Sequence, residues 1–162
     1  MKKKIVLSLL STLIVALIIG FIFLRNLQVL KISGITQSSD IKMVILELKN
    51  SGFRDIKLLN VTMNESQIPD RSELGVSYSN RLVIGDGLEE DPNIKFYDNI
   101  SEIKIKPATN QEEKKLIIQS KKRPTDYGLR IYSKKQIVNV TIKYKYLGLI
   151  YRKEVVLENQ NK

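Results

Sequence analysis

The chain has 162 residues, 43% of them hydrophobic and 27% charged, and it contains no cysteine, histidine or tryptophan. These absences exclude disulfides, a lipid-modified cysteine anchor, thiol nucleophiles and the commonest general base and metal ligand. The excess of 27 basic over 17 acidic residues is uneven, because residues 31–100 carry 8 basic and 11 acidic residues whereas residues 101–162 carry 15 and 6.

The N-terminal segment, residues 1–26, has the pattern of a membrane anchor. Three lysines at positions 2–4 precede twenty uncharged residues, 5–24, and Arg25 ends the run. As a helix this run spans ~30 Å, one bilayer core, and the leading lysines predict a cytoplasmic N-terminus with the remainder extracytoplasmic. The run exceeds a signal-peptide core of about 7–15 residues and lacks an Ala-x-Ala-like site, which favours an uncleaved single-pass anchor over a cleaved, secreted binding protein.

Small residues recur at every fourth position of this run, at Ser8, Thr12, Ala16 and Gly20. Small side chains on one helix face let two helices approach closely in a membrane. The stripe predicts helix packing with a homodimer mate or a membrane-protein partner, and the ordinary composition of a membrane span is the alternative.

The following residues, 27–158, predict one extracytoplasmic β-rich domain, with a disordered tail at 159–162. The first expected strand, 27–35, follows without a flexible stalk, so the domain is expected close to the lipid surface. Strands are next predicted at 41–49 and 53–63, and the turn residues between them predict a hairpin. Shorter strands are predicted at residues 82–84, 94–97 and 103–106.

The C-terminal third predicts one helix and a second hairpin. A capping-box pattern at residues 109–112 begins the expected helix, 111–121, and Pro124 follows it. Apolar residues from Val138 to Tyr146 then alternate with polar residues, as in a half-buried strand. Leu147 and Gly148 predict a two-residue turn into a last strand at 149–157.

The segment Pro124-Thr125-Asp126-Tyr127-Gly128-Leu129-Arg130-Ile131 resembles the start of a strand in fibronectin type III and other immunoglobulin-like domains. The resemblance implies an immunoglobulin-like antiparallel β-sandwich in which the Tyr127 hydroxyl bonds to nearby backbone as a tyrosine corner. The whole chain, rich in Lys, Ile and Asn, is also similar to membrane-anchored single-span surface proteins of low-GC Gram-positive bacteria. That similarity implies a cell-surface location and no activity.

Few residues offer the chemistry of catalysis or metal binding. Four carboxylates fall within residues 86–91, but they lack the alternating spacing of an EF-hand loop, and a solvated turn is the simpler interpretation. Ser120-Lys121 and Ser133-Lys134 place a nucleophile beside a base, yet neighbouring strand residues point to opposite faces. We predict no catalytic residue, no metal and no cofactor.

Basic residues gather around the expected helix and beyond it. The candidates for contact with an anionic surface are Lys114, Lys115, Lys121, Lys122, Arg123, Lys134 and Lys135, and Lys143, Lys145, Arg152 and Lys153 follow them. In an extracytoplasmic domain they predict binding to anionic lipid or wall polymer, and a solvated face that keeps the protein soluble is the alternative. Nucleic acid is not expected, because no base-stacking motif interleaves the charges.

These features together predict a non-enzymatic binding or assembly module at the outer surface of the cell membrane. The alternative is an accessory subunit of a membrane complex that acts through its transmembrane helix.

Overall fold

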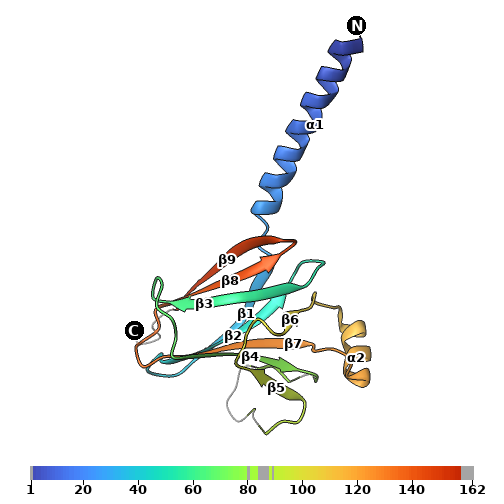
Figure 1. The fold of residues 1–162 in the computed structure, drawn as a ribbon. Helices are drawn as coiled ribbons and strands as arrows, with labels where there is room; N and C mark the ends of the chain where they lie inside the picture. The colour runs from blue at the N-terminus through green and yellow to red at the C-terminus, as the bar shows by residue number, and fades with distance from the viewer. Residues whose placement is uncertain (1, 80, 84–87, 89, 158–162) are drawn as a thin grey trace.

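The computed structural model describes residues 2–79, 81–83, 88 and 90–157, so the tail predicted at 159–162 lies outside it. Within the first helix, the side chains at 2–9, 11, 21, 23 and 25 are likewise outside the description. The elements, shown in Figure 1, are α1 (Lys2–Arg25), β1 (Leu30–Gln37), β2 (Met43–Asn50), β3 (Ile56–Met63), β4 (Arg71–Ser77), β5 (Ile94–Tyr97), β6 (Lys104–Ile105), α2 (Gln111–Ser120), β7 (Asp126–Tyr132), β8 (Asn139–Tyr146) and β9 (Leu149–Val156).

The strands form two sheets that pack face to face as a β-sandwich. One has the order β1-β2-β7-β4-β5 and the other β6-β3-β8-β9, with antiparallel pairing between the named strands. Alternate side chains of both sheets point inward, and Leu46 and Leu129 of the first share one buried core with Leu58 and Ile142 of the second. The predicted mainly β, antiparallel sandwich is therefore confirmed at this level.

Several predicted elements are confirmed closely. Strand β5 has the expected bounds, and α2 ends one residue before the predicted end. The helix cap is shifted by one residue, because the side chain of Asn110 and not that of Thr109 accepts a hydrogen bond from the Glu113 amide. The β8–β9 hairpin turns at Leu147 and Gly148, which both have positive φ angles, as a tight two-residue turn requires.

The hairpin predicted from residues 41–49 and 53–63 is wrong. Strand β2 pairs with β1 and β7, whereas β3 pairs with β6 and β8, so the chain crosses between the sheets after β2. Asn50 holds this crossing, because its side-chain amide donates to the Arg54 and Ile105 carbonyls and its oxygen accepts from the Gly52 amide. A turn signal alone does not distinguish a hairpin from a crossing between two layers, since both need the same turn residues.

Two more strand predictions need correction, and one strand was not predicted. The hairpin in this part of the chain joins β1 to β2, and β1 begins at Leu30 rather than at residue 27. Leu82 and Val83 belong to no strand, and residue 84 lies outside the described part of the chain. Strand β4 was not predicted, because Glu73 and Gly75 interrupt its apolar pattern and are residue types depleted in strands.

Helix α1 projects away from the sandwich on the side of the four-stranded sheet (Figure 1). Its end is fixed by Tyr151, whose hydroxyl donates to the Leu24 carbonyl at 2.6 Å. Within the described residues, no helix is both long enough and apolar enough to cross a membrane. The membrane span predicted at residues 5–24 stays a prediction.

Candidate functional site

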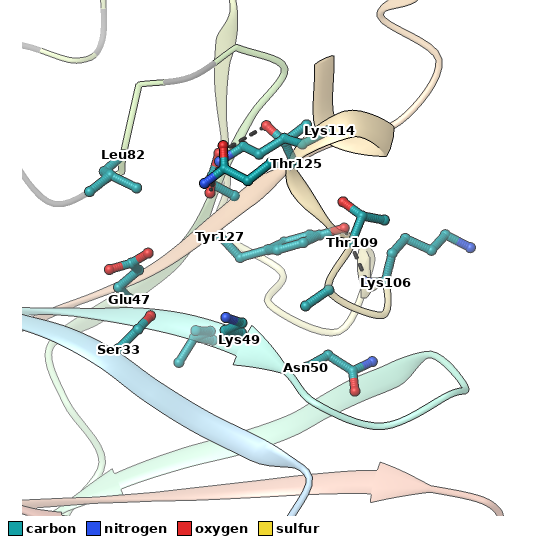
Figure 2. A pocket seen from close by; sticks show the side chains of 14 residues that line it. Ser33, Glu47, Lys49, Asn50, Leu82, Lys106, Thr109, Lys114, Thr125 and Tyr127 are labelled. Atoms are coloured by element: carbon teal, nitrogen blue, oxygen red, sulfur yellow. Dashed lines mark hydrogen bonds and ion pairs between the residues drawn. The ribbon is translucent and has the colours of Figure 1, made fainter. Parts of the chain in front are cut away.

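A polar pocket of about 270 Å³ opens where β1, β2 and β7 meet the segment that leads into α2 (Figure 2). Glu47 and Lys49 of β2 line one side, and Lys106, Thr109 and the first turns of α2 line the other. Tyr127 of β7 lies between the two sides. The pocket therefore brings together charged side chains from segments far apart in the sequence.

Tyr127 joins the two layers of the sandwich at this pocket. Its hydroxyl accepts a hydrogen bond at 3.1 Å from the backbone amide of Lys106, directly after β6 and 21 residues upstream. The side chain is almost fully buried, and this burial raises the pKa of Tyr127 to about 12. The bond differs from a tyrosine corner, whose hydroxyl bonds to backbone only a few residues upstream. Burial raises the pKa of Tyr127, whereas the hydrogen bond from Lys106 lowers it.

Replacing Tyr127 with phenylalanine is expected to lower the free energy of unfolding by about 1–2 kcal/mol at neutral pH, because the Lys106 amide loses its partner. The pKa lies above its ordinary value of 10 in the folded state, so wild-type stability is retained below pH 10 and falls between pH 10 and 12. That fall amounts to about 3 kcal/mol, and the variant lacks it. Urea denaturation should therefore show the wild-type advantage disappear above pH 10 and reverse by about 1–2 kcal/mol near pH 12, with Tyr97→Phe as the control. A constant difference from pH 8 to 12 would contradict this account.

Two lysines of the pocket already form ion pairs. Lys114 lies 2.8 Å from the Asp126 carboxylate, and Lys106 lies 2.7 Å from that of Asp55. Both pairs help to hold the segment between β6 and β7 against the sandwich. With Glu47 and Lys49 opposite, the pocket can bind a small polar molecule through hydrogen bonds and charge.

The structure divides the seven basic candidates between two places. Lys114, Lys115, Lys121, Lys122 and Arg123 lie in or directly after α2, whereas Lys134 and Lys135 follow the opposite end of β7. Because β7 has seven residues, ~20 Å separates the two groups. Lys121 ends α2 in a left-handed conformation, and its ammonium group donates to the Asn93 side chain at 2.8 Å. The seven residues therefore do not form one surface.

The remaining candidates are placed as follows. Thr12, Ala16 and Gly20 are exposed on α1, and the side chain of Ser8 lies outside the description. Much of the acidic segment 86–91 is also outside it, but Asp91 accepts hydrogen bonds from the Asn93 amide and from Arg81, which lower its pKa. In the described parts of the chain, no three carboxylates are grouped so that they could hold a metal ion.

Sequence reasoning named Lys143, Lys145 and Arg152 among the basic residues that follow the helix, but it missed that they form a separate basic surface on the outside of the four-stranded sheet. Strand pairing brings Lys57 and Lys104 beside Lys143, Lys145 and Arg152. The alternation of β8 indicated that Lys143 and Lys145 share one face, but the two other lysines reach it only through long-range pairing. For the chain as a whole, no family model, curated protein or solved structure gives a match.

Proposed function

We propose that this protein is a membrane-anchored binding or assembly module, with α1 as a single span and an immunoglobulin-like sandwich outside the cell. The observation that carries the proposal is the apolar surface of α1. The helix has 24 residues, and its described large side chains are well exposed, with Leu17 at 64% and Ile19 at 61%. Such a surface is costly in water and favours burial in lipid. The leading lysines supply the orientation.

The join between helix and sandwich supports a position close to the bilayer. The hydrogen bond from Tyr151 to Leu24 fixes the end of α1, and Val29, five residues later, is already buried in the core. So short a connection leaves little freedom to move the sandwich away from the lipid surface. The two antiparallel sheets packed face to face support the immunoglobulin-like assignment.

The proposal is tested with single cysteines, because the natural chain has none. Val138→Cys, at a position 54% exposed, should react with a membrane-impermeant maleimide in intact cells. The control Lys3→Cys should react only after the cells are opened. The protein should also resist alkaline extraction from membranes, and mass spectrometry of the mature protein should show that the N-terminal segment is still present. Labelling of Val138→Cys only after lysis, or release by alkali, would refute the proposal.

The exposed stripe on α1 favours a second function, that of an accessory subunit which packs through its helix. A Cβ placed on Gly20 meets no atom within 4 Å, so this side of the helix has room for another helix. Replacing Ala16 and Gly20 with leucine should abolish disulfide cross-linking of Thr12→Cys to a second copy or to a membrane partner, without changing export. The matched control is Val15→Leu with Ile19→Leu, and equal cross-linking in both variants would eliminate this function.

A further inference from the structure

The outer surfaces of the two sheets differ in how far they are covered. Over the five-stranded sheet, Val83 and Leu88 pack with Ile94 and Phe96 in a second small core. Val83 lies directly over Gly128 of β7 and covers this part of the sheet. The outer face of the four-stranded sheet bears exposed polar side chains together with the exposed Ile150 and Val156. This second face is therefore the broad sheet surface that a partner can reach.

Five basic residues define this basic face: Lys57, Lys104, Lys143, Lys145 and Arg152. Strand β8 alternates strictly, since Val140, Ile142, Tyr144 and Tyr146 are buried on the opposite, inner side. Strand β3 has a bulge between Leu58 and Asn60, and its pairing still places Lys57 opposite Lys145. Glu154 of β9 is the acidic residue at an outward position of these strands, and it lies opposite Thr141.

Like charges lie directly opposite each other across the basic face. Lys57 is paired with Lys104 on one side and with Lys145 on the other, and Lys143 is paired with Arg152. Such cross-strand pairs lower stability, whereas opposite charges would raise it. The ion pairs formed among the described residues include none of these five side chains. Their positive charges thus remain available to an anionic partner.

The basic face also contains a hollow of a size suited to a phosphate headgroup. It measures about 240 Å³, and its lining includes Lys143, Arg152, Asn60 and Thr141. Glu65 lines it as well, at the edge formed by the turn after β3. The cationic groups of Lys143 and Arg152, the Thr141 hydroxyl and the Asn60 amide can all donate hydrogen bonds to phosphate oxygens.

Exposed apolar residues lie beside the basic face, at the end of the sandwich nearest to α1. Ile150 is 59% exposed and lies opposite Lys145, and Phe53 is 71% exposed and packs edge-on against Tyr146. Tyr151, next to Ile150, holds the end of α1. Figure 1 shows the four-stranded sheet on the side from which α1 leaves. Apolar side chains beside lysines are typical of surfaces that enter the lipid headgroup region.

We propose that the basic face binds the headgroups of anionic phospholipids in the same bilayer that holds α1. This inference rests on the proposed function, because α1 must bring the sheet to the membrane. The attraction falls off within ~8 Å at physiological ionic strength, so the short connection to α1 matters. Phospholipid suits the face better than a wall polymer, because the exposed Ile150 and Phe53 gain from contact with acyl chains and gain nothing from a soluble polyanion.

The test uses Ile150→Trp in the full chain, where it is the single tryptophan. The protein is reconstituted into phosphatidylcholine vesicles, with and without phosphatidylglycerol, and brominated lipids quench tryptophan that lies near the bilayer. Quenching should be several-fold stronger with phosphatidylglycerol and should weaken with added salt. The control Ile68→Trp, on the exposed loop between β3 and β4, should show little quenching in either membrane. Equal quenching at both positions, or none at Ile150→Trp, would overturn the inference.

Charge reversal separates binding from folding. Lys145→Glu, made with Ile150→Trp, should reduce quenching to the value in pure phosphatidylcholine, while the thermal midpoint stays equal or rises because Glu then faces Lys57. The matched control Lys121→Glu with Lys122→Glu should leave quenching unchanged. Unchanged quenching in Lys145→Glu would refute the inference. If Lys145→Glu lowers retention of the protein on wall preparations, and Ile150→Trp shows no quenching by lipid, the face binds a wall polymer. That outcome would also refute the inference.

Vesicle flotation, read in the same samples, distinguishes the two proposals. If the protein floats with phosphatidylcholine vesicles but Ile150→Trp is quenched in neither membrane, the anchor proposal stands and the lipid-binding proposal is refuted. A chain that floats with neither membrane refutes the anchor, and the lipid-binding face with it.

Discussion

Replacing Glu73 with alanine is expected to lower the free energy of unfolding by about 3–5 kcal/mol, because it removes the carboxylate of a buried ion pair. Glu73 of β4 lies 3.2 Å from the Arg130 guanidinium of β7, and both side chains are less than 5% exposed. Arg130 also lies over the ring of Phe96, at 4.0 Å from its centroid. The substitution leaves a guanidinium charge in this buried site without the carboxylate that balances it. Urea denaturation at neutral pH measures the loss.

The double variant Glu73→Leu with Arg130→Met separates the cost of a broken pair from the value of the pair itself. Replacing the two buried side chains by apolar ones of similar volume removes two desolvated charges together, so the free energy of unfolding should return to within about 1–2 kcal/mol of wild type. Arg71, which also pairs with Glu73, is exposed and keeps its ion pair with Asp98. If the double variant is as unstable as Glu73→Ala, the instability of Glu73→Ala does not come from an unbalanced buried charge, and our explanation of it is wrong.

Gly128→Ala is expected to lower the free energy of unfolding by about 2–3 kcal/mol, through overpacking against backbone. A Cβ at this position overlaps the Val83 carbonyl oxygen and lies 2.8 Å from the Val83 Cβ. Because the obstacle includes backbone, the whole covering segment must move away from β7. Hydrogen exchange should therefore accelerate around Val83 in addition to the global loss measured by denaturation.

The matched control for this change is Gly34→Ala in β1. There the new Cβ lies 3.0 Å from the far end of the Glu47 side chain, which can rotate away. Both substitutions add one methyl group to a strand of the same sheet, so their difference reports the contact with the covering segment. Equal stability losses at the two positions would contradict the assigned role of Gly128.

The two outer faces of the sandwich differ in role, because one is partly covered by other residues and the other is exposed and basic. On the five-stranded sheet, Gly75 and Gly128 leave space for Val83, and Phe96 lies over Arg130 of the buried Glu73–Arg130 pair. On the four-stranded sheet, five of the positions facing outward carry lysine or arginine, whose charges form no ion pair among the described residues. We therefore expect substitutions on the first face to change stability and substitutions on the second face to change binding.

The amino-acid sequence was sufficient for elements whose signals are local. The alternation from Val138 to Tyr146 and the turn at Leu147 and Gly148 predicted the β8–β9 hairpin, because both features depend on residues a few positions apart. The cap, apolar run and following proline predicted α2 for the same reason. The alternation of apolar and polar residues also indicated a β-rich domain.

Tertiary structure alone decided how these elements combine. Residues 50–55 join strands in different sheets, and that choice depends on Asn50 bonding to the distant Ile105 carbonyl rather than on the turn residues themselves. In the same way Lys57, Lys104 and Lys145 form one row only because three strands pair in register. Residues that are far apart along the chain become neighbours through the free energy of packing the whole sandwich, which no local pattern contains.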